Sequence, residues 1–137
     1  MEGVKVKAVL AGVATDILGS TLVGIVEAVI LVVVAAHGGD ASAAHVLQLK
    51  STFEAEFSGL VGTTFCTGLG GYVSVRVSRL KNLRSALMVG VISLVLGCLV
   101  ALYGHGMVLG WKIVAGAILT IPAAVAGGYL AVGAMAA

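Results

Sequence analysis

Charged side chains are scarce in this sequence, and that scarcity excludes an ordinary soluble domain. Only 10% of the 137 residues are Asp, Glu, Lys or Arg, whereas 60% are hydrophobic. Soluble globular domains carry about 25% charged residues, because a short chain has a large surface that polar groups must cover. Proline is also scarce, with one residue against 20 glycines, and glycine is enriched in membrane helices. The composition therefore predicts an integral membrane protein.

Three stretches have no charge at all, and their lengths are 19, 27 and 25 residues: 57–75, 85–111 and 113–137. A helix needs ~20 mainly apolar residues to cross ~30 Å of hydrocarbon, so each stretch suffices for one crossing and is too short for two. A further stretch, 8–36, is apolar except for Asp16 and Glu27. An unpaired backbone cannot lie in lipid. We therefore predict one all-α transmembrane domain, 1–137, of four helices over about 8–36, 57–76, 85–104 and 113–134.

Basic residues are divided unequally between the two sides of this predicted bundle. Six lie before the first span or between the second and third spans, and two, Lys50 and Lys112, lie on the other side. Short cytoplasmic segments are enriched in Lys and Arg, so both termini are expected in the cytoplasm. Four of the six could also bind anionic lipid headgroups, although fixing the topology alone would explain them. The six are Lys5, Lys7, and the four headgroup candidates Arg76, Arg79, Lys81 and Arg84.

The outer segment 37–56 is long enough to hold a helix of its own. Ser51 and Glu54 within it have the spacing of a capping box. Apolar residues here recur at helical spacing, which favours a short amphipathic helix on the membrane surface that could continue into the second span. These residues are Val46, Leu49, Phe53 and Phe57.

A weak internal repeat relates the two predicted hairpins. Gly70-Gly71-Tyr72 in the second span matches Gly127-Gly128-Tyr129 in the fourth at an offset of 57. Gly12-Val13 in the first span matches Gly90-Val91 in the third at an offset of 78. Both hairpins point the same way, so a duplication would give a parallel repeat about an axis along the membrane normal.

Small residues recur about every four positions in the first two predicted spans. The two Gly-Gly-Tyr motifs of the repeat add a pair of adjacent glycines to the second span and another to the fourth. Small residues let helix backbones approach closely, and hydroxyl groups bond across the gap. Glycine scattered by composition alone is the alternative. The predicted packing residues are Gly12, Ser20, Gly24, Gly59, Thr63, Thr67, Gly70, Gly71, Gly127 and Gly128.

Asp16 and Glu27 are the two acids inside an apolar stretch. They are 11 residues apart, ~1100° of helical rotation, so they lie on one face and ~16 Å apart along it. An acid at the bilayer centre costs at least ~2.5 kcal/mol, so it usually faces protein, water or a partner. The pair could form a proton or cation path or a docking point for another subunit, or one acid could lie at the membrane surface. Arg76 is the partner we expect for Asp16, because both are predicted toward the cytoplasmic side.

No recognisable site for catalysis, a cofactor, a metal or nucleic acid stands out. The three histidines and Asp40 fall on the predicted outer side, where they could bind a metal, but no pair has a ligand spacing. They are therefore interpreted as loop residues. Cys66 and Cys98 lie inside spans and are interpreted as small buried apolar residues, not as a disulfide. The histidines are His37, His45 and His105.

The segment Gly68-Leu69-Gly70-Gly71-Tyr72-Val73-Ser74-Val75-Arg76, followed by a basic loop, resembles a pattern in small four-helix bacterial membrane proteins. Asp16 followed by Gly19-Ser20 is similar to these proteins too. The resemblance covers about a fifth of the chain. It implies the four-helix architecture and a bacterial plasma membrane, and no activity.

Two functions are compatible with these features. The first is a non-catalytic accessory or structural subunit of a larger membrane complex, because the chain is small, has no recognisable site and has small-residue faces on several helices. Its partners would be the lipid bilayer and other membrane subunits or copies of itself. The alternative is a small oligomeric transporter or channel that uses Asp16 and Glu27.

Overall fold

The protein is all-α in the computed structural model, which describes residues 5–39, 42–79, 83–104 and 111–136. No strand occurs among these residues, so the predicted all-α class is confirmed. Five helices follow one another: α1 (Val6–His37), α2 (Ala43–Lys50), α3 (Phe53–Ser78), α4 (Arg84–Gly104) and α5 (Trp111–Ala134).

Two of the described helices are long and apolar enough to cross a membrane. They are α1, with 32 residues, and the segment Ile113–Ala134 of α5, with 22 residues, and 18-residue windows within them have mean hydropathies of 2.6 and 1.9. The apolar part of α4, Arg84–Val100, is shorter. α3 has 26 residues, but Glu54 and Glu56 lie in its first turn and Arg76 in its last. The uncharged part of α3 is therefore shorter than the helix itself.

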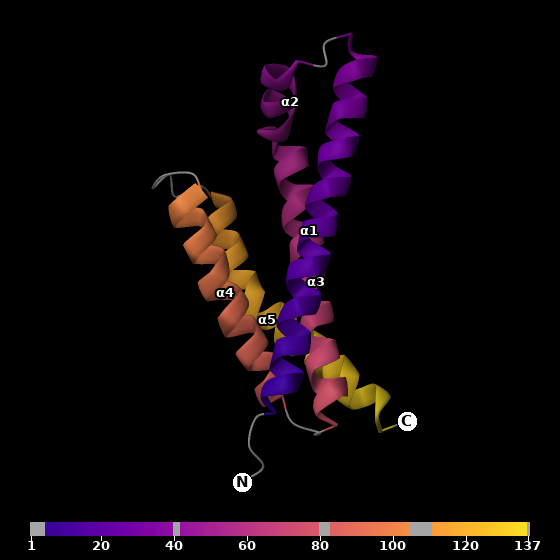
Figure 1. Cartoon of the computed structure of the whole chain (residues 1–137), viewed down its shortest axis with the longest axis vertical. Coiled ribbons are helices and arrows are strands. Elements are labelled where there is room, and N and C mark those ends of the chain that lie inside the picture. The colour runs from indigo at the N-terminus through magenta and orange to yellow at the C-terminus, as the bar shows by residue number, and fades with distance from the viewer. Residues whose placement is uncertain (1–4, 40–41, 80–82, 105–110, 137) are drawn as a thin grey trace.

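The helices form two antiparallel hairpins that meet at one end and separate toward the other (Figure 1). α1 packs along α3, and α4 packs along α5. α3 also contacts both α4 and α5, whereas α1 contacts α4 and, among the described residues, has no contact with α5. α2 lies at the open end, and the start of α1 and the end of α5 lie at the closed end (Figure 1). α3 is therefore the helix on which the assembly of the bundle depends.

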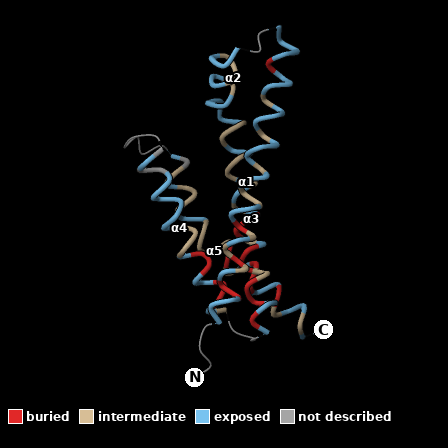
Figure 2. Tube along the Cα trace, viewed as in Figure 1, coloured by how far each residue is buried: buried red, intermediate tan, exposed pale blue. Residues whose placement is uncertain are grey.

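Burial is concentrated at the closed end of the bundle (Figure 2). Val75, Ala86 and Ala131, one from each of α3, α4 and α5, are fully buried there. Large apolar side chains elsewhere face outward, for example Leu18 at 71% and Val100 at 70% exposure. The accessible surface of 8592 Å² exceeds the ~6,600 Å² expected for a soluble monomer of this mass. An exposed apolar surface this large is typical of a region that contacts lipid or another protein.

Polar caps mark the helix boundaries at the open end. Ser42 caps α2 by accepting a hydrogen bond from the backbone N–H of His45, at 3.3 Å. Thr52 caps α3 by accepting one from Ala55, at 3.4 Å. The expected capping box from Ser51 is wrong by one residue, because the Ser51 hydroxyl donates instead to the Gln48 carbonyl. The predicted amphipathic helix is therefore split, with Phe53 and Phe57 in α3.

The closed end is held by a contact between the two ends of the first hairpin. The Lys5 Nζ donates a hydrogen bond of 2.9 Å to the carbonyl of Ser78, in the last turn of α3. A cation at a helix C-terminus is favourable because the last carbonyls lack intrahelical partners. Arg79 then leaves the helix in a left-handed conformation with φ 55°.

We expect Lys5→Met to destabilise the bundle by about 0.5–1 kcal/mol, because it removes this charge and donor from the end of α3. Lys7→Met is the matched control, since Lys7 is exposed and its side chain has no hydrogen bond among the described residues. The measurement is the unfolding midpoint of each purified variant in detergent. Equal midpoints for Lys5→Met and Lys7→Met would contradict the proposed role of the contact.

α1 and α3 touch along a seam of small side chains. A Cβ added to Gly12 would lie 2.6 Å from the carbonyl oxygen of Gly70, so these backbones are in direct contact. Contacts recur every three or four residues along α1, as packing against a neighbouring helix at a small angle requires. The pairs are Gly12 with Gly70, Asp16 with Thr67, Gly19 with Cys66, Val23 with Gly62 and Glu27 with Gly59.

Gly24 lies off this seam, and its predicted packing role is wrong. Nothing lies within 4 Å of a Cβ added there. The physical reason is the helical period: each step of four residues rotates ~40° past a full turn. Three such steps from Gly12 therefore place Gly24 ~120° away, whereas Gly19 and Val23 stay within about 20° of Gly12.

α3 and α5 cross at a second and closer contact. A Cβ added to Gly71 would overlap the carbonyl oxygen of Ala124, and one added to Gly127 would overlap that of Gly68. The contacts of Gly71 with Ala124 and of Gly68 with Gly127 centre between 69 and 70 on α3 and between 125 and 126 on α5, an offset of 56. That offset is one residue short of the 57 between the two Gly-Gly-Tyr motifs, so the crossing lies within one residue of where a twofold repeat would place it. The missing α1–α5 contact makes any such symmetry approximate.

Candidate functional site

A cavity of about 250 Å³ opens between the two hairpins, and all four long helices line it. Its polar wall comes mainly from α1 and α3, and its apolar wall from α4 and α5. Figure 1 shows the hairpins separating on the α2 side of this region. The lining residues are Asp16, Ser20, Thr63, Thr64, Thr67, Ser93, Leu94, Gly97, Cys98, Ile113, Gly116, Ala117 and Thr120.

Asp16 is buried where α1, α3 and α4 meet. The Thr67 hydroxyl donates a hydrogen bond of 2.9 Å to Asp16 Oδ1, and the Ser93 hydroxyl donates to Oδ2. A longer contact of 3.5 Å joins the Ser20 hydroxyl to Oδ1. A carboxylate offers about four lone-pair positions. The three hydroxyls occupy at most three of them, so the Asp16 carboxylate can still accept a hydrogen bond from a group in the cavity that this residue lines.

The other hydroxyls of the cavity are predominantly acceptors. Thr63 and Thr64 each donate their single proton to a backbone carbonyl of α3, with bonds of 2.9 Å and 2.7 Å to Gly59 and Leu60. Thr120 donates to the carbonyl of Gly116 at 2.6 Å. A hydroxyl has one donor and two lone pairs, so these oxygens have only acceptor capacity left. A solute in the cavity therefore meets acceptors rather than donors.

Asp16 has no cationic partner among the described residues, and the expected pairing with Arg76 is not found. The Arg76 side chain is exposed, with its Nε 3.2 Å from the Tyr72 hydroxyl and its guanidinium 5.7 Å from the centre of that ring. Arg76 lies nine residues beyond Thr67 along α3, ~13.5 Å of helix. The register of the α1–α3 seam, which sequence alone did not specify, sets this separation.

Glu27 lies on the same side of α1 as Asp16 but outside the cavity. Its Oε2 would be 3.0 Å from a Cβ added to Gly59, so Gly59 makes room for the carboxylate. No hydrogen bond or ion pair to Glu27 occurs within the described ranges. The structure therefore keeps the two acids on one seam and gives only Asp16 a polar environment.

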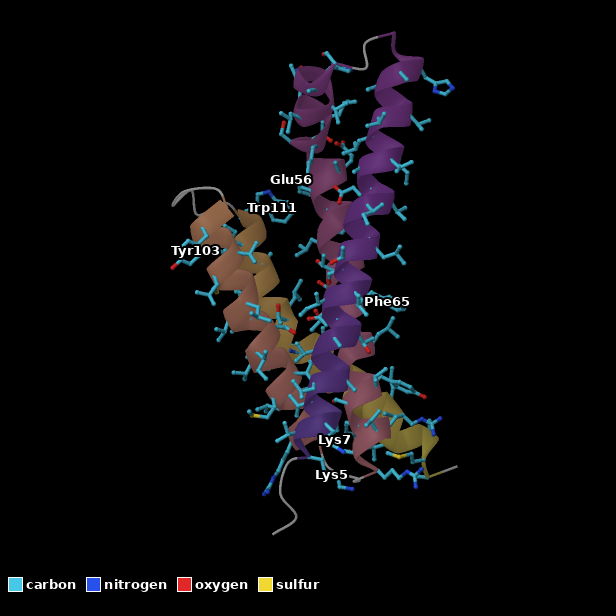
Figure 3. All side chains as sticks on the ribbon, in the orientation of Figure 1. Lys5, Lys7, Glu56, Phe65, Tyr103 and Trp111 are labelled. Carbon is cyan, nitrogen blue, oxygen red and sulfur yellow. The ribbon has the colours of Figure 1, made fainter. Side chains whose placement is uncertain are left out.

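An aromatic cluster joins α3 to α5 at the open end of the bundle. The Trp111 Nε1 donates a hydrogen bond of 2.9 Å to Glu56 Oε2, and the two labelled side chains face each other in Figure 3. The rings of Phe53 and Trp111 stack with centres 5.4 Å apart, and those of Phe53 and Phe57 are 5.9 Å apart. This cluster holds the first turns of α3 and α5 together beyond the cavity.

Basic residues gather at the opposite end, where Lys5 and Lys7 lie (Figure 3). Of the four headgroup candidates, Arg76, Arg79 and Arg84 are exposed. Lys81 lies outside the described residues. Contact between these exposed arginines and anionic lipid headgroups stays a prediction.

The histidines and cysteines do not gather into a site. Across the part of the chain that is described, no three His, Cys, Asp or Glu residues come together in a way that could hold a metal. His37 bonds through Nδ1 to the carbonyl of Val33 at 2.8 Å, and His105 and Asp40 lie outside the described residues. Both cysteines are free: Cys66 is buried, and Cys98 is exposed and lines the cavity.

Three hydroxyl residues of the cavity, Thr64, Ser93 and Thr120, were not among the predicted site residues. Ser93 and Thr120 are each a lone hydroxyl in the middle of an otherwise apolar helix. Polar residues deep in a span usually face the bundle interior. The position of Ser93 and Thr120 in the middle of apolar stretches, like that of Asp16, was therefore the sequence signal that could have identified these two residues.

No protein-family model, curated protein or solved structure matches this chain. The resemblance to small four-helix bacterial membrane proteins therefore stays a prediction from the residues. Function has to be argued from the site itself.

Proposed function

We propose that this chain is a multi-pass membrane protein that binds a small cation at Asp16 and carries it across the bilayer. The observation that carries the proposal is a buried carboxylate that accepts from the Thr67 and Ser93 hydroxyls, has the Ser20 hydroxyl 3.5 Å away, and is paired with no cationic side chain among the described residues. A charged group within a membrane marks an ion or substrate path when it faces a cavity. The acceptor-rich lining favours a cation over an anion.

Four crossings, with both termini in the cytoplasm, are part of the proposal. α3 and α4 are 26 and 21 residues long, enough for ~30 Å of hydrocarbon, and each lies against a helix that qualifies as a span. The described basic residues at the closed end favour that end as the cytoplasmic one. The cavity would then open toward the outside. By the resemblance noted above, the membrane would be a bacterial plasma membrane.

Cysteine labelling tests the topology. In a background with Cys66→Ala and Cys98→Ala, a cysteine replacing exposed Ser42 should react with a membrane-impermeant maleimide applied to intact cells. A cysteine replacing exposed Arg84 should react only after the membrane is opened, because positive segments are retained inside. The opposite pattern would contradict the orientation, and labelling of both sites from outside would contradict the four crossings.

A second candidate function, an accessory subunit, is favoured by the far end of α1. Val29, Ile30 and Val34 there are each more than half exposed, and this part of the helix extends beyond α4 and α5 (Figure 1). An apolar surface of this kind is a site for protein contact. Native mass measurement of the gently solubilised protein separates the two functions. A foreign subunit in constant ratio supports the accessory function, and the chain alone or with its own copies supports the carrier.

A further inference from the structure

The walls of the cavity differ in chemistry, and that difference restricts which cation it can take. Asp16 lies at the deep side with Thr67 and Ser93. Leu94 and Ala117, from α4 and α5, are apolar lining residues. Ile113, two residues after the start of α5, makes the wall apolar toward the open end. A ligand that fits this cavity has a charged donor group at one end and an apolar group at the other.

The size of the cavity argues against a bare metal ion. A volume of about 250 Å³ is that of roughly eight molecules of liquid water at ~30 Å³ each. A dehydrated alkali ion beside Asp16 would leave most of this volume to water lying against an apolar wall. An apolar group that displaces such water gains binding free energy.

The lining also argues against a quaternary ammonium ion. Such ions have no N–H donors and are recognised by aromatic rings through cation–π contacts. None of the thirteen lining residues is aromatic. A primary ammonium has three N–H donors, which match the carboxylate of Asp16 and the acceptor oxygens of Thr63 and Thr64.

We infer that the ligand of this cavity is a primary ammonium compound with a short apolar group, in the size range of n-butylammonium. The ammonium group donates to Asp16 and to neighbouring hydroxyl oxygens, and the apolar group lies against Leu94, Ile113 and Ala117. This inference rests on the proposed function, because it identifies the cation bound at Asp16. It adds to that function a preference for a primary ammonium group with a short apolar substituent over other cations.

A ligand panel tests the inference on the purified full-length protein in detergent. The unfolding midpoint is measured at constant ionic strength with n-butylammonium, tetramethylammonium or sodium chloride, and with 1-butanol as the neutral analogue. A ligand that binds the native state raises the midpoint. We expect n-butylammonium to do so at concentrations at least about tenfold lower than any of the other three.

Two glycine variants locate the bound ligand. A Cβ added to Gly97, which lines the cavity, has nothing within 4 Å, and the same is true of Gly24 on the outer side of α1. Gly97→Leu should fill the cavity and abolish the shift caused by n-butylammonium. Gly24→Leu adds the same side chain elsewhere and should leave the shift unchanged.

The outcomes separate this inference from the proposed function. A shift of equal size with sodium or tetramethylammonium, lost in Asp16→Asn, would overturn the primary-ammonium inference and keep the cation site. An equal effect of 1-butanol would show that the apolar wall alone binds, and would overturn it as well. A folded wild-type protein that no cation stabilises would overturn both. Retention of the n-butylammonium shift in Gly97→Leu would place binding outside the cavity and overturn the inference.

Discussion

Gly71→Leu is expected to abolish the native bundle. A Cβ at this position would overlap the carbonyl oxygen of Ala124, which belongs to the backbone of α5 and cannot rotate away. The two helices would have to separate, and with them the buried contact of Val75, Ala86 and Ala131 that joins α3, α4 and α5. Overpacking typically costs about 1–3 kcal/mol and occasionally more, and a clash with a rigid backbone belongs at the upper end of that range. Gly127→Leu should have the same effect, because its Cβ would overlap the carbonyl oxygen of Gly68.

Two other glycines provide graded controls for this prediction. Gly24→Leu has free space at the Cβ and should not destabilise the bundle, since replacing a glycine inside a helix gains up to about 1 kcal/mol. Gly128→Leu should be intermediate, since its Cβ would lie 2.6 Å from the Ala86 Cβ, a longer approach than the one at Gly71 although to an atom that is likewise fixed to the backbone. Unfolding in detergent, followed by the yield of monodisperse protein, measures all four variants. If Gly71→Leu were as stable as Gly24→Leu, the α3–α5 crossing described here would be incorrect.

Asp16→Asn should leave the protein folded and weaken cation binding about a hundredfold, or ~2.8 kcal/mol. The amide keeps the shape of the side chain, and its oxygen still accepts from Thr67 or Ser93. It has no negative charge, however, and a cation left without its counter-charge in a buried site loses several kcal/mol. Calorimetric titration with n-butylammonium and with sodium measures the affinity for either kind of cation. Unchanged affinity in a folded Asp16→Asn protein would remove Asp16 from the site.

The hydroxyl partners of Asp16 should have smaller effects. Thr67→Val keeps the branched shape of the side chain and deletes the donor that lies 2.9 Å from Asp16 Oδ1. Since a hydrogen bond to a charged group contributes about 1.5–3 kcal/mol, we expect cation affinity to fall roughly tenfold or more. Thr21→Val is the matched control, because the exposed Thr21 hydroxyl donates only to the carbonyl of Ile17. An equal loss of cation affinity in Thr67→Val and Thr21→Val would show that deleting any threonine hydroxyl on α1 or α3 weakens binding, and would contradict a specific role for Thr67.

Hydrophobic stretches and caps predicted the helical elements of this fold, whereas its packing depended on tertiary contacts. The stretch over 57–75 marked the middle of α3, but the helix begins at Phe53, because Thr52 supplies a cap that includes Glu54 and Glu56 in the first turn. A four-residue spacing placed Gly24 on the seam. The actual contacts follow the 3.6-residue helical period through Gly19 and Val23. Small residues indicated that seams exist and could not specify which helices form them.

The candidate site shows the same division. Asp16 was identifiable because an acid in an apolar stretch is costly and therefore has a reason to be there. Its partners were not identifiable, because the choice between Arg76 and Thr67 depends on the vertical register of α1 against α3. Ser93 comes from α4, and its approach depends on how the two hairpins pack. Electrostatic complementarity predicted a cationic side chain, Arg76, as the partner of Asp16. In the bundle, Asp16 is instead surrounded by hydroxyl groups and lines an open cavity.

Charge displacement on a solid-supported membrane is the most direct test of a cation site within the bilayer. Proteoliposomes are adsorbed on the electrode and exposed to a rapid step of n-butylammonium or sodium at constant ionic strength. A cation that enters the cavity and reaches Asp16 moves charge into a region of low dielectric constant, and this produces a transient current. We predict a saturable current with wild-type protein and with Gly24→Leu, and none with Asp16→Asn. Currents of equal size from wild type and Asp16→Asn, or no current from folded wild type with either cation, would contradict the cation site at Asp16.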